Sequence, residues 1–289
     1  MKIIDFHTHI YSPEVSAHRE DYLKKDPFFA QLYSNPKARL ASAEELIASM
    51  DEAGIAVSVA QGLNWLTHED CVKSNDYVME AVSRYPQRLA GFGMVLPSAG
   101  EAALRELERC IKGGIKGIGE VRPTELMFAG KQVETLDALA AMAAKNGLTL
   151  STHSSEPLGH RYTGKGKVTP SLLYRLISKY PDLKVVCAHW GGGLPFYEMM
   201  PEVSQTLKNT CYDTAASSLL YRMDIFEYAA GFLPPGKTVF GTDFPLISQQ
   251  KLVKKVAALN LPPDKEENLF SRNAERLLNA APNPTPVPR

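Results

Sequence analysis

Two histidines near the start of the chain are spaced so that both could bind one metal ion. The apolar segment Lys2-Ile3-Ile4-Asp5-Phe6 leads directly into His7 and His9. Side chains two positions apart in a β-strand point to the same face, so both imidazoles would project together from the end of a strand. An isolated pair of this kind is more often two ordinary histidines. The hypothesis of a metal site therefore needs further ligands elsewhere in the chain.

Four more potential ligands stand at or near the ends of other apolar segments. They are Glu120 in Gly117-Ile-Gly-Glu-Val, His153 after Leu148-Thr-Leu-Ser-Thr, His189 after Leu183-Lys-Val-Val-Cys-Ala, and Asp243 in Phe240-Gly-Thr-Asp. Imidazole together with carboxylate suits zinc, and also manganese, iron or cobalt, whereas calcium prefers oxygen ligands. A single histidine at a strand end is usually packed or solvated. Only the joint occurrence of these residues indicates a metal site.

Eight strand-like segments alternate with helical segments along the chain, which predicts an α/β fold. The predicted strands are residues 2–9, 55–62, 89–96, 115–121, 148–153, 183–189, 209–214 and 238–243. Eight such units in one chain of this length indicate a single-domain (β/α)8 TIM barrel. The competing doubly wound sheet loses its main support because no G-x-G-x-x-G motif follows the first strand. Active sites of such barrels lie at the carboxyl ends of the strands, where all the potential ligands would meet.

The domain boundaries follow from the same pattern. We assign residues 1–281 to the barrel and residues 282–289 to a Pro-rich tail. Residues 11–41 form an irregular insertion after the first strand, and loops of such length at this position are often functional. Two capping boxes, Ser42 with Glu45 and Ser98 with Glu101, predict the starts of two helices.

Composition excludes several classes of protein. The chain has 289 residues, and its 32 Lys and Arg balance its 32 Asp and Glu. This balance argues against a nucleic-acid partner held by a broad basic surface. The sequence contains no run of about 18 apolar residues, so no membrane span is predicted. The N-terminus also lacks the apolar core of a signal peptide. Four scattered cysteines without C-x-x-C spacing indicate free thiols. We expect a soluble cytoplasmic protein without nucleic-acid or membrane partners.

Several motifs together resemble the amidohydrolase superfamily. They occur in the expected order over essentially the whole chain: Ile4-Asp-Phe-His-Thr-His9, Thr152-His153, Val186-Cys-Ala-His-Trp-Gly-Gly-Gly193, Phe240-Gly-Thr-Asp-Phe-Pro245 and Arg272-Asn-Ala-Glu-Arg-Leu-Leu278. Within the superfamily the chain is similar to the amidohydrolase-related group, which includes aminocarboxymuconate-semialdehyde decarboxylase and related decarboxylases and lactonases. The motifs are specific for the superfamily and not for one reaction.

The resemblance implies a zinc-type site at the mouth of the barrel. His7, His9, His153 and Asp243 would hold a metal ion and a water molecule, with His189 beside that water as an acid, base or electrostatic partner. Glu120 departs from this pattern, because its motif looks more like that of TatD-type metal-dependent hydrolases, in which such a residue binds metal and bridges two ions. One ion is favoured, two remain open, and a role for Glu120 in orienting a histidine is the third alternative. A homodimer is expected from the relatives only.

The substrate is expected to be a small anion. The loop after the fifth predicted strand carries Arg161 among other basic residues, and Arg122 follows Glu120 closely. Guanidinium groups favour carboxylate or phosphate, so both are candidates for substrate binding, together with Trp190 beside His189. The alternative for the basic loop is a solvated surface segment.

Hydrolysis of an amide, ester or lactone is the favoured reaction. A metal-bound water would attack the substrate, Asp243 would take and return its proton, and His189 would stabilise the developing charge. The alternative is nonoxidative decarboxylation of an aromatic or dienoic acid, which uses the same metal ligands. A catalytically silent barrel that serves as a scaffold is the third possibility.

Overall fold

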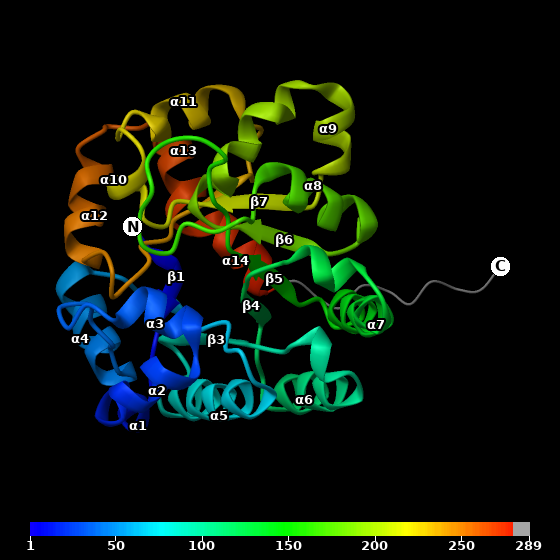
Figure 1. The fold of residues 1–289 in the computed structure, drawn as a ribbon. Coiled ribbons are helices and arrows are strands. Elements are labelled where there is room, and N and C mark those ends of the chain that lie inside the picture. Colours follow the sequence, from blue (N-terminus) through cyan, green and yellow to red (C-terminus); the bar gives the residue numbers. More distant parts are fainter. Residues whose placement is uncertain (280–289) are drawn as a thin grey trace.

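The computed structural model describes residues 1–279, so the predicted tail 282–289 and the end of the predicted domain lie outside the described residues. Eight parallel strands follow one another around a single sheet in sequence order. They are β1 (Ile4–His9), β2 (Val57–Gln61), β3 (Leu89–Gly93), β4 (Gly117–Val121), β5 (Thr149–Thr152), β6 (Lys184–Cys187), β7 (Thr210–Asp213) and β8 (Thr238–Val239). This arrangement confirms the predicted barrel (Figure 1).

Backbone hydrogen bonds between β1 and the segment that includes and follows β8 close the ring. The amide of Phe6 donates to Phe240 over 2.7 Å, and that of His9 donates to Phe244 over 2.7 Å. In the opposite direction, the Asp243 amide donates to the carbonyl of His7 over 2.9 Å. These bonds place Asp243 next to the two histidines of β1, although they are far apart in sequence.

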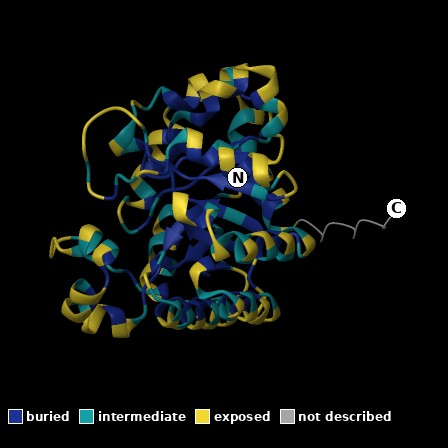
Figure 2. Ribbon diagram, turned by 45° about the vertical axis from the view of Figure 1, so that its right-hand side comes forward, coloured by how far each residue is buried: buried dark blue, intermediate teal, exposed yellow. Residues whose placement is uncertain are grey.

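Helices surround the barrel and cover it from solvent. The α-helices outside the insertion are α4 (Ala43–Ala53), α5 (His68–Arg84), α6 (Glu101–Lys112), α7 (Lys131–Lys145), α8 (Pro170–Lys179), α9 (Pro201–Thr206), α10 (Ser217–Leu220), α11 (Ile225–Phe232), α12 (Gln249–Ala257), α13 (Pro263–Glu267) and α14 (Asn273–Leu278). Shorter or irregular turns are η1 (Pro97–Ala99), η2 (Glu125–Phe128), η3 (His189–Met199) and η4 (Asn268–Arg272). Figure 2 shows exposed residues on the outer faces of the helices and buried residues along the central strands.

The insertion is more regular than predicted. It contains three short helices, α1 (Pro13–Ala17), α2 (Arg19–Lys25) and α3 (Pro27–Tyr33). Two of its prolines begin helices, where a missing amide hydrogen costs nothing, and the side chains of Ser12 and Asp26 cap them. Phe29 anchors the insertion by stacking on Trp65, with 5.5 Å between ring centroids.

One predicted capping box is confirmed and the other is wrong. Ser42 and Glu45 exchange the two hydrogen bonds of a capping box at the start of α4. Ser98 instead lies inside η1, and α6 begins after Gly100 without a side-chain cap. Pro97 favours the tight turn over these residues, and Gly100 then adopts a φ of 58° that separates the turn from the helix.

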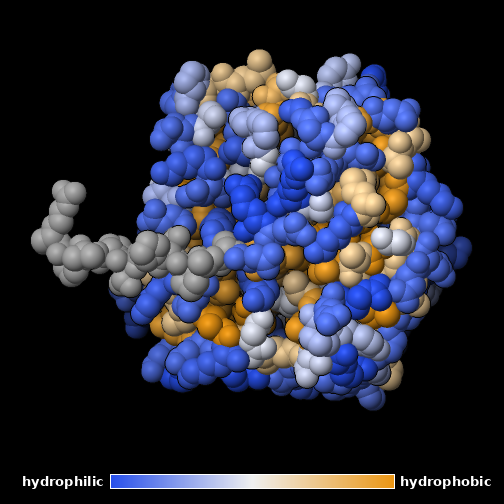
Figure 3. All heavy atoms as spheres, turned by 180° about the vertical axis from the view of Figure 1, so that it is seen from behind, coloured by the Kyte–Doolittle hydropathy of each residue, from blue (hydrophilic) through white to orange (hydrophobic). Residues whose placement is uncertain are grey.

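Two apolar clusters stabilise the fold. The smaller one fills the interior of the barrel, and the larger one lies between the strands and the helices. The interior cluster consists of Ile4, Phe6, Val59, Phe92, Val186, Cys211, Val239, Ala274 and Leu277. The face in Figure 3 is mainly hydrophilic, with smaller apolar areas between the polar side chains. Among the described helices, none is both long and apolar enough to cross a membrane.

Candidate metal centre

His7, His9 and Asp243 form one compact group of potential ligands. The Nε2 atoms of the two histidines lie 3.1 Å apart. Oδ1 of Asp243 is 3.7 Å from Nε2 of His7 and 3.5 Å from Nε2 of His9. All three atoms can therefore surround a single cation. The structure brings together three residues that the sequence predicts as ligands.

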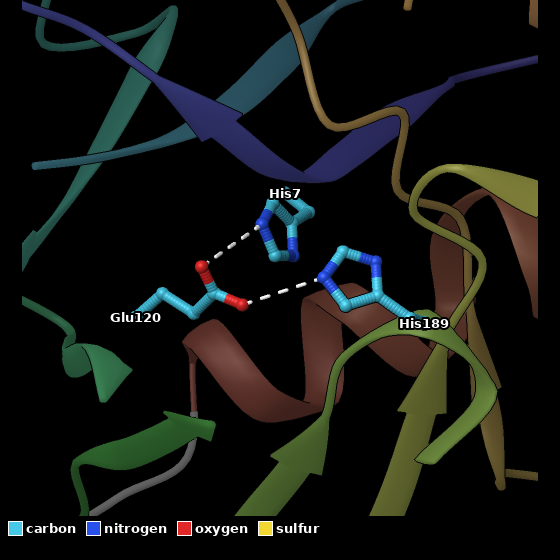
Figure 4. Close-up of side chains that lie close together, drawn as sticks. All are labelled: His7, Glu120 and His189. Atoms are coloured by element: carbon cyan, nitrogen blue, oxygen red, sulfur yellow. Dashed lines mark ion pairs between the residues drawn. The ribbon is translucent and has the colours of Figure 1, made fainter. Parts of the chain in front are cut away.

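The carboxylate of Glu120 lies between this group and further histidines. One of its oxygens faces the group, and the other faces the further histidines. Its Oε2 atom lies 3.9 Å from Nε2 of His7 and 3.6 Å from Nε2 of His9. Its Oε1 atom lies 3.5 Å from Nε2 of His189 (Figure 4). Gly119 allows this placement, because a Cβ there would come within 2.6 Å of the Cβ of Ser151 on the neighbouring strand. A larger residue would push β4 away from β5.

The hydrogen bonds of His7 and His9 show that a cation fits between them. Nδ1 of His9 lies 3.1 Å from the carbonyl of Gly62, which only accepts, so this nitrogen carries the hydrogen. Nδ1 of His7 likewise faces a carboxylate oxygen of Asp213 over 2.8 Å. In the neutral rings, both Nε2 atoms present lone pairs to each other. Positive charge between them removes this repulsion, and a divalent metal ion supplies it.

The charges around His7, His9, Asp243 and Glu120, which we call the metal cluster, also indicate that a cation binds between these residues. Burial alone would lower the pKa of His7, but the adjacent Asp213 outweighs it and raises this pKa to about 10. Burial opposes ionisation of Glu120, yet the nearby His153 holds the pKa of this carboxyl well below its usual range. Burial lowers the pKa of His9, so its ring stays neutral. The site thus combines ionised carboxylates with a group that takes up a proton when no other cation is present.

Asp213 supports the cluster from below and was not among the predicted residues. Besides accepting from His7, it accepts hydrogen bonds over 2.9 Å from the backbone amides of His189 and Ala215. Asp5 is a second such residue, and it accepts from Thr242 through both the backbone amide and the hydroxyl. Asp213 ends β7, so the rule that identified the other strand-end residues applies to it as well.

His153 lies at the cluster but makes two other contacts. Its Nδ1 atom is 2.9 Å from Oε1 of Glu120, and its Nε2 atom is 3.1 Å from the hydroxyl of Ser155. The Ser155 oxygen also accepts from the amide of Gly166. A direct bond from His153 to a metal ion therefore stays a prediction.

Of the two predicted catalytic residues, Asp243 belongs to the ligand group and His189 lies beside it. His189 is buried, and its Nδ1 atom lies 3.2 Å from the carbonyl of Ala215, so the other nitrogen points to Glu120. Burial alone would lower the pKa of His189, but its hydrogen bond to Glu120 and the charge of Asp243 raise it to about 9. Without a bound cation, His189 therefore holds a proton near neutral pH.

A cavity of about 380 Å³ opens above the cluster. Its floor is formed by His9, Glu120, His153, His189 and Asp243. Aliphatic and aromatic side chains form most of its walls, namely Tyr11, Phe28, Leu32, Tyr33, Ala38, Leu63, Tyr162, Ala216, Leu219, Leu220, Pro245 and Leu246. The insertion contributes a large share of these residues, so the predicted functional importance of residues 11–41 agrees with their position.

Of the predicted substrate-binding residues, the structure places only Arg122 at this cavity. Arg161 is exposed to solvent and does not line the cavity. Trp190 is buried elsewhere, where its indole nitrogen donates to Ser217 and its ring packs against Phe226. The reason is the backbone after β6, which is left-handed at both His189 and Trp190 and turns the indole into the outer layer. We therefore withdraw Trp190 and Arg161 from the substrate contacts.

Comparison with known proteins identifies the family. The model of an amidohydrolase family matches residues 4–280. The chain belongs to this family. The resemblance found in the sequence motifs is thereby confirmed.

Two curated relatives carry the names of decarboxylases. The chain is 23% identical over 243 residues to 2-amino-3-carboxymuconate-6-semialdehyde decarboxylase of Dictyostelium discoideum, covering 72% of this chain and 66% of the relative. It is 26% identical over 154 residues to gamma-resorcylate decarboxylase of a Polaromonas strain, covering 45% of this chain and 47% of the relative. The chain thus spans less than two thirds of the length of either relative in these matches.

Solved structures share the fold over nearly the whole chain. The 5-carboxyvanillate decarboxylase of Sphingomonas paucimobilis superposes with a TM-score of 0.78 at 19% identity, covering 96% of this chain and 99% of that one. A dihydroxybenzoic acid decarboxylase of Polaromonas superposes with a TM-score of 0.70 at 19% identity, covering 96% and 97%. The latter structure contains manganese and the inhibitor 2-nitroresorcinol. At these identities the comparison establishes the common barrel.

Proposed function

We propose that this protein catalyses the metal-dependent, nonoxidative decarboxylation of a small aromatic or dienoic carboxylic acid. The apolar cavity directly above the metal cluster is the observation that carries the proposal. A carboxylate loses its charge as carbon dioxide departs, so an environment poor in water favours the transition state over the ionised ground state. The decarboxylase names of the relatives and of the solved structures support this reaction. The sequence allows this reaction as the alternative to hydrolysis, and the cavity together with the names of the relatives favours it.

The residues of the cluster have separate tasks in this reaction. A divalent cation bound by His7, His9 and Asp243 would polarise an oxygen of the substrate next to the departing carboxylate. His189 then delivers a proton from Nε2 to the carbon that loses carbon dioxide, and the electron pair of the broken carbon–carbon bond forms the new carbon–hydrogen bond. Asp213 keeps His7 in the tautomer whose Nε2 atom faces the cation. Arg122, at the cavity wall, attracts the anionic substrate.

The donor set accommodates zinc and manganese alike. Zinc is the metal favoured from the ligand types, and the manganese in the Polaromonas structure makes manganese the other metal to test. We propose a single ion held by His7, His9 and Asp243. A second ion remains the alternative because Glu120 directs its two oxygens at different groups of histidines.

Hydrolysis is the second candidate function, and the placement of Glu120 favours it. A carboxylate that bridges two cations is typical of sites in which a metal-bound water attacks the substrate. In that case His189 would serve as a ligand and not as the proton donor. Two bound ions would favour hydrolysis, whereas a single ion is compatible with both functions.

Product analysis tests the proposal directly. Protein loaded with manganese or zinc is incubated in D₂O with 2,6-dihydroxybenzoate and 5-carboxyvanillate, and in parallel with aromatic lactones and esters. Decarboxylation predicts carbon dioxide release and one deuterium on the product carbon that carried the carboxylate. Turnover of the lactones or esters without carbon dioxide from any acid would overturn it and establish hydrolysis. Metal content below stoichiometric levels after loading would instead favour the silent scaffold.

A further inference from the structure

Among the polar side chains that interrupt the apolar walls of the cavity, two features have no chemical step in the proposed reaction. One is the guanidinium of Arg122, and the other is a pair of tyrosine hydroxyls from Tyr11 and Tyr33. The walls also carry Arg39, Tyr162, His160 and Thr163, and the first two of these already have partners. Arg39 is paired with Glu45, and the hydroxyl of Tyr162 donates to Glu156.

Arg122 is a largely enclosed cation without an anionic partner. Its guanidinium carbon lies 3.9 Å from the ring centroid of Phe28, and one nitrogen donates to the carbonyl of Gly164 over 3.1 Å. A Cβ at Gly166 would come within 2.6 Å of the same nitrogen, so loop and guanidinium pack closely. No carboxylate within residues 1–279 forms an ion pair with Arg122. Burial without compensating charge costs free energy, and an anion in the cavity would offset that cost.

The two tyrosine hydroxyls carry two hydrogens, and the hydrogen bond between them uses only one. The hydroxyls of Tyr11 and Tyr33 lie 2.6 Å apart, so one of them donates to the other. The second hydroxyl hydrogen has no acceptor in the part of the chain that the structure describes. A tyrosine hydroxyl ordinarily loses its hydrogen only at about pH 10, so both hydroxyls carry their hydrogens at physiological pH. The pair therefore offers one neutral hydrogen-bond donor to a molecule in the cavity.

We propose that Arg122 and the Tyr11–Tyr33 pair recognise the part of the substrate that remains after carbon dioxide leaves. This part carries a second carboxylate, which binds Arg122, and a separate oxygen acceptor, which binds the tyrosine pair. The guanidinium matches a carboxylate because two parallel hydrogen bonds can form between them. The substrate is thus a dicarboxylic acid with an additional oxygen substituent on an apolar core. The inference rests on the proposed function, because it takes the first carboxylate to lie at the metal cluster.

Binding measurements test this subsite without turnover. The manganese-loaded protein is titrated by calorimetry with benzoate, benzene-1,3-dicarboxylate and the 5-methoxy derivative of the latter. We expect each added group to tighten binding, by at least about 10-fold for the second carboxylate and about 3-fold for the methoxy oxygen. Arg122→Gln should abolish the first gain and weaken the binding of benzoate, which has no second carboxylate, much less. The matched control Arg161→Gln, in the exposed part of the neighbouring loop, should change neither.

The tyrosine pair makes a more specific prediction. Tyr11→Phe and Tyr33→Phe each leave one hydroxyl with its hydrogen, so each single variant should keep most of the methoxy preference. The double variant should lose it while retaining the dicarboxylate preference. Equal losses for benzoate and dicarboxylate in Arg122→Gln would show that Arg122 only holds Phe28 and Gly164 together, and would overturn the proposal. Failure of every aromatic carboxylate to bind the unaltered protein would overturn the proposed function as well.

Discussion

The floor of the cavity and its upper walls are built in opposite ways. At the floor, strand ends hold histidines and carboxylates, and further residues such as Asp213 and Asp5 fix their orientation through hydrogen bonds. The walls come largely from the insertion and from the loop after β5, and they are mostly apolar. For the proposed reaction, we expect the floor to determine the chemistry and the walls to determine which molecule undergoes it. We therefore predict that the two can be changed independently.

Removal of a residue at the floor is the severest test of this division. Asp243→Asn replaces a charged ligand with a neutral amide, and we expect a loss of metal together with a decrease in kcat/KM of about 1,000-fold or more. Metal content measured by mass spectrometry and steady-state kinetics would show both effects. The surface variant Asp137→Asn serves as the control. Retention of full metal content and activity in Asp243→Asn would contradict the assignment of the floor.

A smaller effect on metal binding is expected from a change at Asp213, which orients the ligand His7. Asp213→Asn places an amide hydrogen either against Nδ1 of His7 or against the amides of His189 and Ala215. The first arrangement forces a hydrogen onto Nε2 of His7, so metal affinity should fall about 10- to 100-fold. Competition with a chromophoric chelator measures this affinity. Glu106→Gln, a buried carboxylate between α5 and α6, should leave it unchanged.

The pH dependence of metal binding tests whether His7, and also His189, must lose a proton when the cation binds. Because the pKa of His7 is raised to about 10, the free site carries a proton there at lower pH, and a cation must displace it. Metal affinity should therefore increase by about tenfold for each pH unit between pH 6 and pH 8. His189, whose pKa is raised to about 9, would add a second displaced proton if it is also a ligand. A slope near two would then support the two-ion alternative, and a slope near zero would contradict the role of His7.

The walls should respond more weakly and only in substrate selection. Leu219→Ala removes apolar contact area at the cavity, so we expect KM to rise about threefold with metal content and kcat unchanged. Leu126→Ala, at an exposed leucine outside the cavity, is the matched control. A large fall in kcat for Leu219→Ala would show that walls and floor are not independent.

The same contrast explains what could be predicted from the sequence. His7, His9, Glu120 and Asp243 were predictable because a barrel brings all strand ends to one face, whatever the details of packing. Asp213 obeys the same rule but was overlooked, since its weak strand carries no recognisable motif.

The walls depend on details that strand order does not determine. Trp190 was predicted to contact substrate, and the left-handed backbone at positions 189 to 193 sends it elsewhere. The Tyr11–Tyr33 contact depends on three short helices in a segment predicted to be irregular. Such contacts arise from tertiary packing, which local sequence signals do not contain.

The filled interior of the barrel has a kinetic consequence. Phe6, Phe92, Ala274 and Leu277 are buried within one cluster, so side chains of the described residues fill the barrel beneath the metal site. We therefore expect substrate, product and any released gas to enter and leave through the cavity above the metal site. A retained product consequently blocks the next substrate, so product inhibition should be competitive. Mutations that widen the mouth of this cavity would then raise turnover where release is the slow step.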